Sequence, residues 1–194
     1  PTPSLSTEGN AVELVKARGP LDILINNQGA IPHGTVTALD DKTLSDAWDL
    51  KVFGFINLTR EIYRDMCDKK CGVIVNIIGV AGERPAANYI AGSMGNAALM
   101  ALSRALGAES PDYGVRVLGL HPGAIETDWQ VVRRKARAEQ ARGDENRWRE
   151  LTTGFQVGRL GTWDEISDTV AFLHPEASAF RPGTGPPIEV GDAV

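Results

Sequence analysis

Three short apolar runs recur along the chain, at residues 21–26, 72–78 and 115–120. Each run is nearly continuous rather than alternating, which is typical of strands covered on both faces of a parallel sheet. Longer segments with helical spacing separate the runs, so their order predicts a βαβαβ unit with right-handed crossovers. We therefore expect an α/β fold with a doubly wound parallel sheet, in a single domain.

Helix-capping and helix-stopping residues fall between these runs. A first helix is expected to start at residues 6–7, where Ser and Thr can cap it, and to stop at the Gly-Pro pair 19–20. The first crossover helix is expected over about 40–67 and the second over about 91–109. Small residues in the second, with apolar residues around 53–56 in the first, indicate helix faces that can pack against another subunit. We expect a homodimer or homotetramer.

The last third of the chain begins with a polar stretch that mixes basic and acidic side chains, a pattern typical of a helix with solvated faces. Thr162 and Glu165 then have the spacing of a capping box, which predicts a helix through residue 173. Residues 186–190 can form a last strand at the sheet edge, since edge strands tolerate the proline at its start.

Composition narrows the class of protein. With 42% hydrophobic residues, a chain of 194 residues can bury one core. The formal net charge of −5 argues against a general nucleic-acid or anionic-membrane surface. No apolar run approaches the roughly 20 residues of a membrane span, and the first residues show no signal-peptide pattern. Cys67 and Cys71 fit neither a disulfide framework nor a two-pair zinc site, so we expect reduced thiols, no metal and a cytoplasmic location.

Several segments carry family motifs in a collinear order. LDILINNQG at 21–29 and VNIIGVAG at 75–82 resemble the fourth and fifth strands, with their loops, of the short-chain dehydrogenase/reductase (SDR) family. HPGAIETD at 121–128, GRLGTWDEISDTVAFL at 158–173 and IEVGD at 188–192 resemble its later segments. The resemblance implies a Rossmann-type domain that transfers a hydride between NAD(H) or NADP(H) and a small carbonyl or alcohol substrate.

The resemblance also assigns roles to two loops and one longer segment. Residues 128–157 take the place of the family's substrate lid, and their length and charge would suit a bulky or anionic substrate. Trp129 and Trp148 would be apolar contacts of this lid, although packing explains them equally well. By the same resemblance the cofactor-binding residues are Asn27, Gln28, Gly29, Pro122, Gly123, Ile125 and Thr127.

The family's glycine-rich phosphate-binding turn follows its first strand, and this sequence contains no counterpart. A parallel sheet without its first strands would expose an apolar edge. We therefore expect this sequence to be the C-terminal part of the domain, with about two βα units before it in the whole protein. The alternative is a fragment that cannot hold a dinucleotide.

The resemblance aligns a changed residue with each member of the family's catalytic set. Gly79 stands at the position of the family's Ser, Gly92 at its Tyr, Asn96 at its Lys and Lys51 at its Asn. Lys and Asn have thus exchanged places between two helices that would flank the same pocket. The exchange keeps one ammonium group in the site.

These changes suggest a rearranged catalytic site. Tyr89, close in the chain to the family's Tyr position, would donate the proton to the substrate oxygen. Lys51 would lower the pKa of Tyr89 or polarise a carbonyl, while Asn96 and Ser93 would give hydrogen-bonding support. A solvated Lys51 and a Tyr89 that only packs over the sheet remain alternatives.

Two other classes of function also remain open. One is a catalytically inactive protein that keeps the SDR fold as a binding or assembly partner. The other is a non-redox lyase or isomerase that uses Lys51 or Tyr89 in the same pocket.

Four further polar residues follow strand ends or lie in loops. His121, after the third apolar run, is of more interest than His33, which lies in a loop rich in Pro and Gly. No Asp or Glu stands at a spacing that would orient His121. Asn26 and Asn27 are expected to bond the backbone and fix the end of the first strand.

Overall fold

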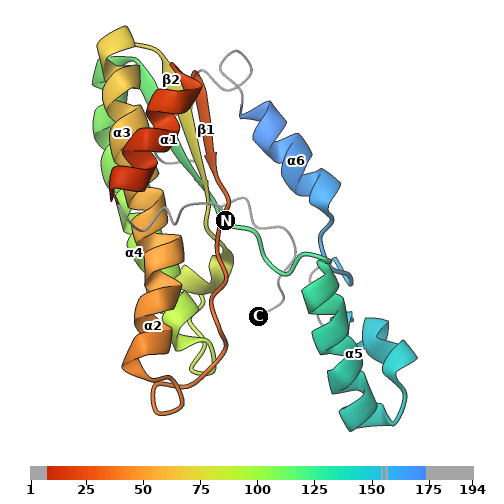
Figure 1. Ribbon diagram of the computed structural model, residues 1–194. Coiled ribbons are helices and arrows are strands. Elements are labelled where there is room, and N and C mark those ends of the chain that lie inside the picture. The colour runs from red at the N-terminus through yellow and green to blue at the C-terminus, as the bar shows by residue number, and fades with distance from the viewer. Residues whose placement is uncertain (1–7, 154, 156, 174–194) are drawn as a thin grey trace.

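A three-stranded parallel sheet forms the centre of the computed structural model, which describes residues 8–153, 155 and 157–173 (Figure 1). The strands are β1 (Ile23–Asn26), β2 (Gly72–Ile77) and β3 (Val115–Leu120), in the order β1-β2-β3. The α/β fold and all three predicted strands are confirmed. The predicted helix start at 6–7 and the edge strand at 186–190 lie outside the described residues.

Helices occupy most of the remaining described chain. The crossover from β1 to β2 contains α2 (Asp41–Trp48), the π-helical turn η1 (Asp49–Phe53) and α3 (Gly54–Lys69), and α4 (Ile90–Glu109) connects β2 to β3. The short 3₁₀ turns η2 (Val80–Gly82) and η3 (Ser110–Tyr113) flank α4. The other elements are α1 (Glu8–Arg18), α5 (Asp128–Arg142), the 3₁₀ segment η4 (Glu145–Thr152) and α6 (Trp163–Phe172).

Helices cover both faces of the sheet, as a doubly wound fold requires. On one face, Ile62 and Met66 of α3 pack with Leu24, Ile74 and Val117 of the three strands. Figure 1 shows α1, α3 and α4 together on this side and α6 on the opposite side. None of the helices in the described part of the chain is long and apolar enough to cross a membrane.

The opposite face of the sheet packs on α6. Val75 of β2 and Leu120 of β3 belong to one buried cluster with Ile166 and Leu173. The predicted capping box is confirmed, because the Thr162 hydroxyl accepts from the Glu165 amide and the Glu165 carboxylate accepts from the Thr162 amide.

The first crossover helix differs from its prediction. It starts as expected, with the Asp40 carboxylate capping the Thr43 amide. It is then interrupted at Asp49–Phe53 by the π-helical turn η1, which carries Lys51 at its centre. A π-turn shifts the direction of every later side chain and is frequent at functional sites.

A buried chain of hydrogen bonds ties two helices to the sheet. The Asn26 amide nitrogen donates to Thr59 Oγ1 of α3 at 3.1 Å and to Asn76 Oδ1 of β2 at 2.8 Å. Asn76 in turn donates to Ser103 Oγ of α4 at 2.8 Å. The prediction that Asn26 bonds the backbone is therefore wrong, since its partners are side chains of neighbouring elements. Asn27 is exposed.

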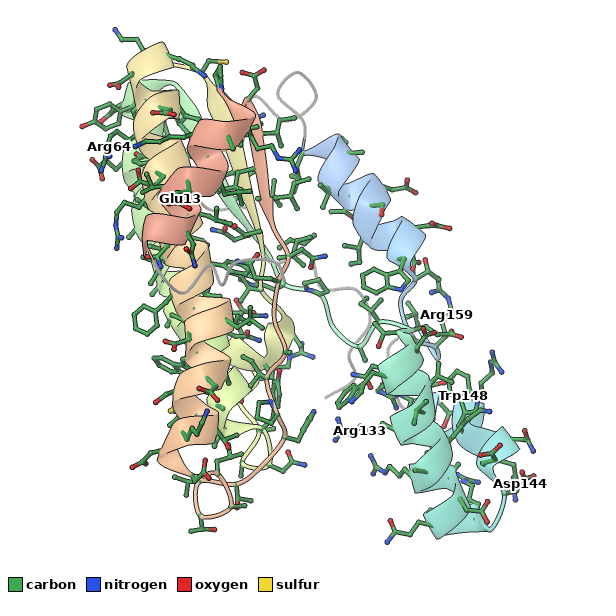
Figure 2. The ribbon with its side chains drawn as sticks, in the orientation of Figure 1. Glu13, Arg64, Arg133, Asp144, Trp148 and Arg159 are labelled. Atoms are coloured by element: carbon green, nitrogen blue, oxygen red, sulfur yellow. The ribbon has the colours of Figure 1, made fainter. Side chains whose placement is uncertain are left out.

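The segment α5–η4 has its own small core and lies apart from the sheet in Figure 1. Ala138, Trp148 and Leu160 are buried in this core. Trp148, which Figure 2 labels between α5 and η4, is 4% exposed, so packing accounts for it. The lid function of residues 128–157 remains a prediction.

Candidate active site

Two adjoining pockets lie where the three parallel strands end. The larger has a volume of about 750 Å³ and the smaller about 290 Å³. Both are lined by the loops that follow β1, β2 and β3, and they share Gly29, Gly79 and Pro122. Ligands of open α/β sheets bind beyond the carboxyl ends of the strands, which makes this edge the candidate active site.

The smaller pocket brings together every residue that the sequence assigned to cofactor binding. Gln28 has a buried Nε2 atom without a hydrogen-bond partner among the described residues, so it could donate to a ligand. Lys51 lines the same pocket. The seven assigned residues that meet there are Asn27, Gln28, Gly29, Pro122, Gly123, Ile125 and Thr127.

Lys51 points from η1 into this edge of the sheet. Its Nζ donates to the Ile78 carbonyl at 2.8 Å. A Cβ at Gly29 would lie 2.9 Å from the Lys51 Cδ, so a side chain there would make the lysine shift. Burial lowers the pKa of Lys51 to about 8, because the ammonium loses hydration. Lys51 is thus a pocket residue rather than a solvated one.

Asn96 holds the same loop from the other side. Its Nδ2 donates to the Gly79 carbonyl at 3.2 Å, next to the carbonyl that Lys51 binds. Its Oδ1 is buried without a partner in the described chain, which leaves an acceptor available near the larger pocket that Asn96 lines. Lys51 and Asn96 therefore converge on one loop from two helices.

Gly79 has a backbone that suits glycine alone. Its φ of +109° lies in a region that other residues rarely adopt. A Cβ at this position would also lie 3.1 Å from Asn96 Nδ2. The serine that the SDR family carries here would be strained in this loop.

Tyr89 takes the space that a side chain at Gly92 would need. It precedes α4 as the N-cap residue, and its ring would overlap a Cβ built on Gly92. The half-buried ring lines the larger pocket. Burial raises the pKa of Tyr89, an effect that the positive charge of Arg133 partly offsets. The ring of Tyr89 thus lies beside position 92, which the resemblance aligns with the family's tyrosine.

Ser93 is not brought to either pocket. Its hydroxyl accepts from the Ala86 amide at 3.1 Å, and the residue is 3% exposed. The side chain instead fixes the loop before α4.

Two residues that the sequence did not single out as functional, His33 and Arg133, meet Trp129 of the predicted lid at the mouth of the larger pocket. His33 lies between the rings of Tyr89, with centroids 4.4 Å apart, and Trp129, with centroids 5.5 Å apart and nearly parallel planes. Arg133 Nη1 donates to His33 Nε2 at 2.8 Å. Burial and the charge of Arg133 lower the pKa of His33, while a hydrogen bond to the Asn88 backbone raises it. His33 is therefore neutral near pH 7.

The expectation for the histidines is reversed. His33, not His121, lines the candidate site. The sequence did hold one indication of this, because His33 follows the carboxyl end of β1, where ligands of such sheets bind. His121 is 5% exposed and has its Nδ1 3.3 Å from a Glu83 carboxylate oxygen. No acid close in sequence pointed to this contact, because Glu83 comes from the loop after β2 and reaches His121 only through the fold.

No group of three or more His, Cys, Asp or Glu side chains arranged to hold a metal occurs among the described residues. Cys67 and Cys71 are free thiols.

Comparison with known proteins identifies the family that this chain resembles. The family model described as short chain dehydrogenase matches residues 6–138. An uncharacterized oxidoreductase of Thermotoga maritima is 29% identical over 170 residues, covering 88% of this chain and 66% of the relative. The 2,3-dihydro-2,3-dihydroxybenzoate dehydrogenase of Bacillus subtilis is 29% identical over 171 residues, covering 84% and 64%. The chain thus spans about two thirds of the length of these relatives.

Solved structures agree on the fold. A short chain dehydrogenase/reductase family protein superposes with a TM-score of 0.80 at 27% identity, covering 96% of this chain and 73% of that one. The L-sorbose reductase of Gluconobacter frateurii, solved with NADPH and L-sorbose, has a TM-score of 0.86 at 22% identity, covering 96% and 72%.

Proposed function

Since the chain belongs to the short-chain dehydrogenase family, we propose that it is part of an NAD(H)- or NADP(H)-dependent oxidoreductase that acts on a carbonyl/alcohol pair. The names of its relatives support this, because they are dehydrogenases or oxidoreductases. We further propose that its catalytic site is rearranged rather than lost.

One observation carries the rearranged site. The Tyr89 ring fills the space beside Gly92 and lines the larger pocket, so a phenol is still present next to the place where the family has its tyrosine. The exchange of Lys and Asn supports the same conclusion, because both side chains still reach the loop after β2.

The chain's own residues would divide the work as follows. Tyr89 stays protonated because burial raises its pKa, and it would donate the proton to the substrate oxygen. At neutral pH the Lys51 ammonium stays charged beside the loop after β2. There it would stabilise negative charge that develops on the substrate oxygen. Asn96 would accept a hydrogen bond from the substrate or donate one to it. Ser93 would act only by fixing the loop before α4.

The smaller pocket fits the nicotinamide end of a cofactor. Its glycines let a planar group approach the backbone, and Gln28 supplies a donor that lacks a partner in the described chain. Asn27, Gly29, Pro122, Gly123, Ile125 and Thr127 would complete the contact. The cofactor, when bound, would supply or accept the hydride.

Titration of the whole protein, including any βα units that precede this sequence, with NADH and NADPH tests the proposal, followed by a screen of carbonyl substrates. We expect saturation with one or both cofactors, and loss of turnover in Tyr89→Phe and Lys51→Met with cofactor binding retained. Failure to bind at millimolar cofactor would contradict the proposed activity. Unchanged turnover in both variants would contradict the rearranged site alone.

A non-redox role of the same pocket is the second candidate function. It is favoured by Gly79, whose backbone conformation would strain the family's serine. This role predicts a folded protein that binds small carbonyl compounds but transfers no hydride from either cofactor.

We also propose a homodimer or homotetramer in the cytoplasm, with α3 and α4 at the subunit contact. A groove of about 500 Å³ runs between these helices and is lined by Ile56, Tyr63 and Leu106. Phe53, which precedes α3, is 45% exposed. Sedimentation velocity tests the assembly, and a concentration-independent monomer would contradict it.

A further inference from the structure

The larger pocket has an unusual distribution of charge. Arg133 is the one charged side chain among the described residues that line it, and no carboxylate lines it. Figure 2 shows Arg133 projecting from the side of α5 that faces the sheet and its helices. No described acidic residue forms an ion pair with this guanidinium. The pocket is therefore cationic at its mouth and mostly apolar inside.

The guanidinium is held in position by neutral groups. One of its nitrogens donates to His33 Nε2 at 2.8 Å, and its centre lies 5.4 Å from the Trp129 ring centroid. His33 is itself fixed between Tyr89 and Trp129. These contacts restrict the long side chain without neutralising it, so its remaining N–H groups can donate to an anion.

The start of α5 adds to the same preference. Thr127, Trp129, Gln130 and Arg133 all line the pocket and come from the first turns of α5 or its cap. The N-terminal end of a helix of this length carries a partial positive charge that favours anions. Asp128 lies on the same turn but is exposed and does not line the pocket.

From this geometry we propose that the substrate carries a carboxylate, which Arg133 binds at the mouth of the larger pocket while the carbonyl lies beside Tyr89. The inference rests on the proposed function for the identity of the reacting group. Arg133 is then a specificity-determining residue, and His33 and Trp129 are its positioning residues. A planar carboxylate suits the fork of a guanidinium better than a neutral amide does.

The test compares acids with amides of the same size. The protein is titrated with 4-oxopentanoate and 6-oxoheptanoate and with their amides, following tryptophan fluorescence, because Trp129 lies at the pocket. We expect at least one acid to bind roughly tenfold more tightly than its amide, the effect of one charge-assisted contact at a partly solvated site. Arg133→Gln should remove this preference and leave amide binding within about twofold.

Arg137→Gln is the matched control. Arg137 lies one turn further along α5, is exposed and lines neither pocket, so its loss changes the net charge equally. The preference for acids should survive in this variant. Equal binding of acids and amides in the wild type, or a preference that persists in Arg133→Gln, would overturn the inference.

Two further measurements separate this inference from others. If Arg133→Gln weakens NADPH binding as much as acid binding, the arginine serves the cofactor and the inference is wrong. Acid-selective binding without turnover would overturn the proposed oxidoreductase activity and leave the carboxylate site standing. Turnover without acid selectivity would support the oxidoreductase activity and overturn the carboxylate site.

Discussion

The pKa of Lys51 predicts how the stability of the protein depends on pH. Burial lowers this pKa from 10.5 to about 8. At about 1.4 kcal/mol for each tenfold change in an equilibrium constant, the cost of keeping the ammonium charged in the fold is about 3 kcal/mol. The hydrogen bond to the Ile78 carbonyl favours the charged form, which brings the expected cost to about 1–3 kcal/mol.

The sign follows from counting protons. Below pH 8 the lysine is charged in both the folded and the unfolded chain, and the fold bears the full cost. Between pH 8 and 10.5 the folded chain has released a proton that the unfolded chain still binds, so this group makes the free energy of unfolding rise with pH. Lys51→Met removes the titration. The stability of the variant relative to the wild type should therefore fall by about 1–3 kcal/mol from pH 7 to pH 10.

Urea unfolding at pH 7, 8, 9 and 10 measures this difference, and other titrating groups cancel between the two proteins. Lys42→Met is the control, since Lys42 is exposed on α2 and its hydrogen bond to Asp46 raises its pKa. Its titration falls above this range, so the control should show no such trend. A Lys51→Met difference that does not change with pH would refute the buried position of the ammonium.

Three further substitutions test the packing of the site and the core. Gly92→Ala should displace the Tyr89 ring and destabilise the protein by about 1–3 kcal/mol in urea unfolding; an unchanged midpoint would show that the ring does not lie over Gly92. Asn76→Ala should cost about 1–3 kcal/mol by leaving the partners of its amide unsatisfied, and a neutral result would contradict the buried chain of hydrogen bonds. Met66→Ala should cost about 2–5 kcal/mol because Met66 is fully buried under the sheet, and a small loss by calorimetry would contradict that packing.

The strands and the doubly wound arrangement could be predicted because short continuous apolar runs, separated by helical segments, are typical of strands buried in a parallel sheet. The Thr162 capping box was equally predictable, since it depends on two residues close in sequence. The π-turn was not, because the residues around Lys51 suit a regular helix as well. The extra residue in that turn depends on packing rather than on local preference.

The mouth of the larger pocket shows a second limit. His33 and Arg133 are separated by 100 residues, and their contact depends on how α5 is placed. Arg133 and Arg134 are neighbours in a run of basic residues, yet one faces the pocket while the other lies over the Phe155 ring. Adjacent helical residues point about 100° apart, so only the rotation of α5 decides which arginine is available to a ligand.

The changed residues of the site depend on one another in space. Gly79 is matched to Asn96, whose amide lies where a side chain at 79 would point. Gly92 is matched to Tyr89, whose ring lies where a side chain at 92 would point. In both pairs the glycine leaves the space that the neighbouring side chain occupies. This fit is compatible with the proposed rearranged site, which would keep a phenol, an ammonium and an amide around one loop.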